Sequence, residues 1–197
     1  GYSGGLIGFW WTGCSEFTGC EIKNLTVKSS SADAGGMAGG GPIATFTDCT
    51  VTGGTVTGGQ NVGGMLGYED GGGTFKNCRV TGTQVTSSGV AAGGMVGSVK
   101  GTGANHADFN GCATKDATVS ASQYAGGLVG LSSTENYKDQ FTKCKIISVK
   151  IGNSLGTTAD AGGMVGRATG AEFDACTVSG GSTENKLTTV TGMSHIG

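Results

Sequence analysis

Several features that mark common function classes are missing from this chain. No apolar run approaches the length that spans a bilayer. The 12 basic and 14 acidic residues give a formal charge of −2 and form no basic stripe of the kind that attracts nucleic acid. Neither a Gly-x-Ser-x-Gly elbow nor a His-Glu-x-x-His motif occurs. We therefore expect no catalytic residue, no cofactor, no nucleic-acid partner and no membrane insertion.

Helical and collagen patterns are missing as well. No useful run has a period of 3.6 residues, and good helix formers are scarce. Proline occurs once, at Pro42, whereas glycine supplies 42 of the 197 residues. Glycine does not recur at every third position, which excludes collagen. Because the glycines keep register with apolar residues, we also reject a flexible low-complexity chain.

What the sequence has instead is a repeat. The motif Gly-Gly-(Leu/Met)-apolar-Gly occurs six times, its first glycines lying at 4, 35, 63, 93, 126 and 162, so the spacings are 31, 28, 30, 33 and 36 residues. A second motif, Phe-x-x-Cys, runs in phase with the first. Its members are Phe17, Cys20, Phe46, Cys49, Phe75, Cys78, Phe109, Cys112, Phe141, Cys144, Phe173 and Cys176. Such self-similarity is typical of one structural unit stacked on itself.

The repeat predicts an all-β fold. β-Branched residues follow the cysteines at fixed offsets and alternate with Gly, Ser, Thr, Asn and Asp, which is the strand signal. We expect a parallel β-solenoid (β-helix) of about six coils, each of roughly 30 residues, forming one domain over residues 1–197. It should be right-handed, as parallel crossovers usually are. The Phe and Cys positions should form inward-facing ladders, and glycine should serve at turns or where coils pack closely.

The repeat built from these two motifs resembles the GLUG motif. Gly93–Gly97 and Gly126–Gly130 match it closely, and the resemblance covers essentially the whole chain. It departs at Ala38, where a larger apolar residue is usual, and at the four copies that carry Met for Leu. The resemblance implies an extracellular or cell-surface repeat region of the kind found in bacterial adhesin-like proteins. It carries over no catalytic residue.

We accordingly predict a structural or adhesive module, a stalk or filament segment that displays its corner loops. The chain starts at Gly1 without a signal peptide or initiator methionine, and its two ends lie at the same phase of the repeat. We interpret it as a processed product or an excerpt, flanked by further repeats or stacking end to end. A ligand-binding solenoid for glycan or ice is the alternative, and a polysaccharide-active β-helix enzyme ranks below it.

The variable segment between the two motifs predicts a binding corner. We expect it to contact a host glycan or surface protein, because exposed aromatic side chains commonly stack on sugars or anchor partners. The alternative is that these residues merely cover the core. The candidate residues are Trp10, Trp11, Tyr68, Glu69, Asp70, His106 and Tyr137. An enzyme would need clustered carboxylates such as Glu69, Asp70 and Asp139, for which we prefer a solvated loop.

Two further patterns leave alternatives open. The seven cysteines include no Cys-x-x-Cys pair, which argues against a metal site. We expect a column of buried thiols, with Cys14–Cys20 as the best candidate for a single disulfide bridge.

The position three residues after each cysteine of the Phe-x-x-Cys motif tests ice binding. It reads Lys23, Thr52, Thr81, Lys115, Ile147 and Ser179, so a threonine array would cover only two adjacent coils.

Overall fold

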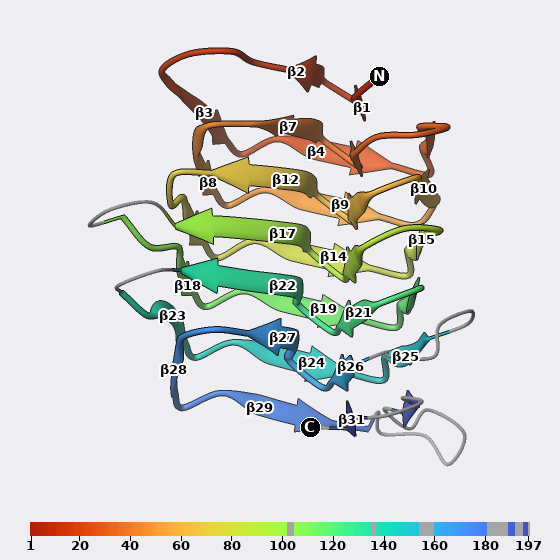
Figure 1. Ribbon diagram of the computed structural model, residues 1–197, viewed down its shortest axis with the longest axis vertical. Coiled ribbons are helices and arrows are strands. Elements are labelled where there is room, and N and C mark those ends of the chain that lie inside the picture. Colours follow the sequence, from red (N-terminus) through yellow and green to blue (C-terminus); the bar gives the residue numbers. More distant parts are fainter. Residues whose placement is uncertain (102–104, 135–136, 154–159, 181–188, 192–194, 197) are drawn as a thin grey trace.

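The computed structural model describes residues 1–101, 105–134, 137–153, 160–180, 189–191 and 195–196, and it is a parallel β-solenoid. In the described part of the chain there are only strands, turns and bends, and every strand pairing is parallel. The chain winds through about five turns of roughly 32 residues, from the N-terminal coil at the top of Figure 1 to the C-terminal coil at the bottom. The predicted fold class is confirmed.

Each coil contributes one short strand to each of five sheets, which we call A to E in the order in which the chain meets them. Sheet A holds β1 (Ser3–Gly4), β6 (Ala34–Gly35), β11 (Asn61–Gly63), β16 (Ala91–Gly93), β21 (Tyr124–Gly126), β26 (Asp160–Gly162) and β31 (His195–Ile196). Sheet B holds β2 (Ile7–Phe9), β7 (Ala38–Gly41), β12 (Leu66–Asp70), β17 (Val96–Gly101), β22 (Val129–Thr134) and β27 (Val165–Ala168).

The other three sheets complete the wall of the solenoid. Sheet C holds β3 (Cys14–Thr18), β8 (Ile43–Thr47), β13 (Thr74–Lys76), β18 (Asp108–Asn110), β23 (Asp139–Thr142) and β28 (Ala171–Asp174). Sheet D holds β4 (Glu21–Lys23), β9 (Thr50–Thr52), β14 (Arg79–Thr81), β19 (Ala113–Lys115), β24 (Lys145–Ile147) and β29 (Thr177–Ser179). Sheet E holds β5 (Thr26–Lys28), β10 (Thr55–Gly58), β15 (Gln84–Ser87), β20 (Thr118–Ala121), β25 (Lys150–Asn153) and β30 (Thr189–Thr191).

The double-glycine motif forms the tight connection between sheets A and B. Its first glycine ends the strand of sheet A and pairs with the first glycine of the next copy, as Gly63 does with Gly93. A Cβ on Gly93 would overlap the carbonyl oxygen of Val96, and one on Gly97 would overlap the backbone of Val62 in the coil before. None of the glycines of this motif has a positive φ. Close approach of backbones, rather than left-handed geometry, therefore requires them.

The Phe-x-x-Cys motif fills the core behind sheet C. The phenylalanine of each coil pairs with the next in register, and neighbouring rings stack with centroids 4.4 to 5.2 Å apart. From Phe46 to Phe141 these rings are buried. Met37, Met65, Met95 and Leu128 of the glycine motif are also fully buried, so the interior is mainly apolar. No single coil encloses this core, because the ladders run through all of them.

Two corners of each coil need left-handed backbone. The first follows sheet C, at Gly19, Asp48, Asn77, Gly111, Lys143 and Ala175, with φ between 50° and 66°. The second follows sheet D, at Asn24, Gly53, Gly82, Asp116 and Ser148. Gly, Asn and Asp accept this conformation at small cost, whereas Lys and Ala are strained in it.

This strain makes a stability prediction for coil five. Replacement of Lys143 by Gly should stabilise the protein by about 0.5–1 kcal/mol, because relief of left-handed strain exceeds the added entropy of the unfolded chain. Lys145→Gly, two residues on within β24, should destabilise it by a similar amount, because its backbone is extended. Urea unfolding of both variants measures the two changes. Equal destabilisation by both substitutions would contradict the strain argument.

Candidate functional site

The predicted binding corner lies where the chain passes from sheet B to sheet C. The structure does not bring its seven residues into one site. Trp10 and Trp11 belong to the first coil, and Tyr68, Glu69 and Asp70 lie on β12 in the third. His106 and Tyr137 come from the next two coils and stack on one another, with ring centroids 6.4 Å apart. The corner therefore divides into an N-terminal cover, a buried carboxyl group and a small aromatic pair.

Trp10 covers the end of the core. Its side chain is only 8% exposed and its ring occupies the space that a Cβ of Gly41 would need, one coil below. The ring also lies edge-on to Phe17, at 6.3 Å between centroids, and Phe17 is 5% exposed. Trp10 is thus part of the packing and offers little surface to a partner. Trp11, by contrast, is 84% exposed and touches Phe9 edge to face.

Glu69 and Asp139 are fully buried, so the expectation of a solvated loop is wrong for both. Glu69 pairs with Gly41 on one side and with Val99 on the other, in a column that faces the interior. Among the described residues neither of its carboxyl oxygens has a hydrogen-bond partner of good geometry. Burial raises the pKa of Glu69 to about 9, although the backbone N–H groups of Gly72 and Gly73 oppose part of this shift. Glu69 is therefore protonated at neutral pH.

Asp139 is held by hydrogen bonds in the same corner, two coils further on. The Ser132 hydroxyl donates to its Oδ2 at 2.6 Å, and the Ala107 backbone N–H donates to its Oδ1 at 2.8 Å. Burial raises the pKa of Asp139 above its ordinary value, and these two donors work against the shift. Because neither Glu69 nor Asp139 reaches the surface, the two carboxyl groups cannot serve as an acid and base toward a polysaccharide.

The buried acid makes stability depend on pH. Between the ordinary pKa of 4.5 and about 9, folded Glu69 keeps a proton that the unfolded chain releases, so stability falls as pH rises through this window. Glu69→Gln should remove most of this slope and stabilise the protein by roughly 3 kcal/mol at pH 7. Urea unfolding from pH 4 to pH 9 tests this. The exposed control Glu16→Gln should keep the wild-type slope; the same slope in Glu69→Gln would refute a buried, protonated Glu69.

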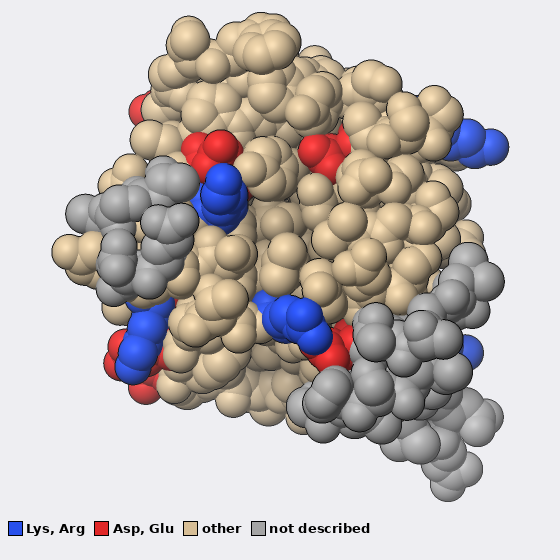
Figure 2. Space-filling model, viewed as in Figure 1, with Lys and Arg blue, Asp and Glu red and all other residues tan. Residues whose placement is uncertain are grey.

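A shallow polar groove of about 340 Å³ crosses sheet C beside the aromatic pair. It is lined by Thr74 and Lys76 of β13, Asp108 and Asn110 of β18, Gln140 and Thr142 of β23, and Phe109. His106 links the groove to the corner, since its Nε2 lies 3.3 Å from Asp108 Oδ1. Figure 2 shows few charged side chains on the face that it displays; several basic groups lie beside acidic ones, and one at the upper right stands apart. Sequence inspection alone did not suggest this groove.

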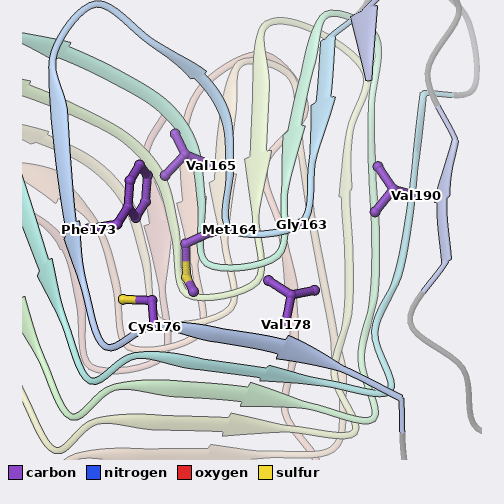
Figure 3. Close-up of a pocket in the computed structure, with 7 residues that line it drawn as sticks. All are labelled: Gly163, Met164, Val165, Phe173, Cys176, Val178 and Val190. Atoms are coloured by element: carbon purple, nitrogen blue, oxygen red, sulfur yellow. The ribbon is translucent and has the colours of Figure 1, made fainter. Parts of the chain in front are cut away.

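The two ends of the solenoid differ. At the C-terminal end Phe173 is 50% exposed and Val178 46% exposed, although their counterparts one coil earlier, Phe141 and Ile146, are fully buried. They border an apolar hollow of about 520 Å³ (Figure 3), whose lining is Gly163, Met164, Val165, Phe173, Cys176, Val178 and Val190. At the N-terminal end Trp10 covers the phenylalanine ladder, but Leu6 remains 49% exposed.

The seven cysteines are all free thiols. The predicted Cys14–Cys20 bridge is wrong, because the extended strand β3 (Cys14–Thr18) separates the two residues by more than a disulfide can span. In the Phe-x-x-Cys column every thiol from Cys49 onward donates to the carbonyl of the phenylalanine one coil earlier, as Cys112 does to Phe75 O at 3.2 Å. No three His, Cys, Asp or Glu side chains among the described residues form a cluster suited to a metal ion.

Thiol burial predicts three rates of modification. Cys14 is exposed and should react with a thiol reagent at once, whereas Cys20 and Cys176 are half-buried and should react more slowly. Cys49, Cys78, Cys112 and Cys144 should react only after unfolding, since they are buried, and burial raises the pKa of Cys49 to about 11. Peptide mass spectrometry after timed labelling checks the order. Equal labelling of Cys112 and Cys14 in the native protein would contradict the ladder.

Comparison of the chain with protein-family models, curated proteins and solved structures finds no match. The resemblance to the GLUG motif accordingly stays a prediction. Within the described residues no helix has the length and apolar character to cross a membrane.

Proposed function

We propose that this chain is a non-catalytic structural module, an adhesin-like repeat displayed outside the cell, and that its open C-terminal end is completed by a second copy of the same chain. The contrast between the two ends supports the self-association. Phe17 lies beneath Trp10, whereas Phe173 at the other end of the same ladder is half exposed. A flat end of parallel strands also leaves backbone N–H and C=O groups unpaired. A further coil would cover the exposed apolar side chains and also pair these backbone groups.

The placement outside the cell is supported by the resemblance of the repeat to surface proteins. The four deeply buried thiols of the column are shielded from oxidants, so they are compatible with an oxidising compartment. The non-catalytic role is supported by the burial of Glu69 and Asp139, the carboxyl groups that a polysaccharide-active site would have needed.

Sedimentation of the wild-type protein over a wide concentration range, with electron microscopy of the same samples, tests the self-association. We expect concentration-dependent dimers or filaments. Val178→Asp puts a charge in the apolar hollow. Because burial of an unpaired charge costs much free energy, this variant should stay monomeric.

The matched control is Thr177→Asp, an exposed neighbour on the same strand, which should associate like the wild type. Protection of Cys112 from labelling shows that each variant keeps its folded core. A wild-type protein that stays monomeric at the highest concentration would refute the proposed self-association.

A further inference from the structure

The sheet C groove presents a regular polar surface on three neighbouring coils. Thr74, Asp108 and Gln140 lie side by side in one register, and Lys76, Asn110 and Thr142 in the next. Equivalent side chains therefore recur at the strand spacing of about 4.8 Å along the solenoid axis. This spacing is comparable to the length of one pyranose ring in an extended chain.

The groove offers donors and acceptors that are not used within the protein. Asn110 and Gln140 are exposed, and among the described residues their side-chain amides make no hydrogen bond. Each amide can donate and accept at once, which suits neighbouring hydroxyl groups of a sugar. The single positive group, Lys76, is balanced by the single negative group, Asp108.

An aromatic pair lies beside the groove, on the side where the strands of sheet C begin, since His106 precedes β18 and Tyr137 precedes β23. Tyr137 is 50% exposed, and its ring lies nearly parallel to that of His106, at an interplanar angle of 19°. The Nδ1 atom of His106 is buried and has no partner among the described residues, while Nε2 faces Asp108. The pair thus fixes an exposed aromatic face beside the polar ladders.

We propose that the sheet C groove binds a neutral, extended polysaccharide, with its rings running along the solenoid axis and one ring stacked on Tyr137. A polar groove with a few orienting groups and an aromatic wall fits such a ligand. A nucleic acid would require an excess of positive charge, which the groove lacks. A protein partner would require an apolar centre, and the groove side chains are almost all polar. This binding surface goes beyond the proposed structural role, and its lining shares no residue with the apolar hollow at the C-terminal end.

The test measures binding of cellohexaose and chitohexaose by NMR titration of the full chain. Val178→Asp serves as the parent protein, so that end-to-end association does not interfere and failure of one proposal is separable from failure of the other. We expect millimolar or tighter binding that does not change with salt, because the ligand is neutral. Asn110→Ala combined with Gln140→Ala should weaken it at least about tenfold, and Tyr137→Ala about tenfold.

The matched control is Gln84→Ala combined with Lys145→Ala, which removes exposed side chains from sheets E and D and should leave affinity unchanged. Retained protection of Cys112 confirms that all variants are folded. Absence of binding to both oligosaccharides at millimolar concentration would overturn the proposal. So would binding that the groove and Tyr137 variants leave intact, or a preference for a heparin-derived hexasaccharide that is lost in high salt and in Lys76→Ala.

Discussion

Parallel stacking in register is the constraint on which this molecule depends. Because each residue lies against its equivalent one coil away, a column of identical inward side chains must be one that packs well on itself. Phenylalanine satisfies this through offset stacking, with ring centroids 4.4 to 5.2 Å apart. Cysteine satisfies it by donating its S–H to a carbonyl of the coil before, so that a small polarizable group replaces a void. The glycine motif serves where the backbones of sheets A and B pass too closely for any side chain.

The sequence was sufficient to predict the architecture because the repeat specifies it several times. The first glycines of the copies, and the phenylalanines that follow them, pair one to one in the sheets, although the segments between them vary in length. To predict which residues stack, it is enough to know the position of each residue within its repeat, and a single sequence shows this. The Cys14–Cys20 bridge failed for a different reason. Sequence proximity suggested a short loop, whereas the strand at Cys14–Thr18 holds the two residues apart.

The corner could be predicted only in part, because a charged side chain such as that of Glu69 was expected to face the solvent and instead faces the interior. Glu69 lies two residues after its motif, at the same offset as Val99, and that apolar counterpart was a signal that the position faces inward. The burial of Trp10 depends on Gly41, whose missing side chain leaves room one coil away. The meeting of His106 and Tyr137 had no comparable signal, since the segments that carry them differ in length. The sheet C groove is visible only once the register of three strands is known.

The one-coil-at-a-time construction also has a mechanical consequence. Each coil is bonded only to the coils above and below it, so a pull on the two ends of the chain loads the interface of a terminal coil before any interior one. Phe173 and Val178 are half exposed, so the coil that carries them is held by less apolar burial than the coil before it, where Phe141 and Ile146 are fully buried. Release of one turn of about 32 residues frees roughly 100 Å of extended chain. A solenoid stretched in this way lengthens in steps and dissipates work at each one, while the remaining coils keep their folded cross-section.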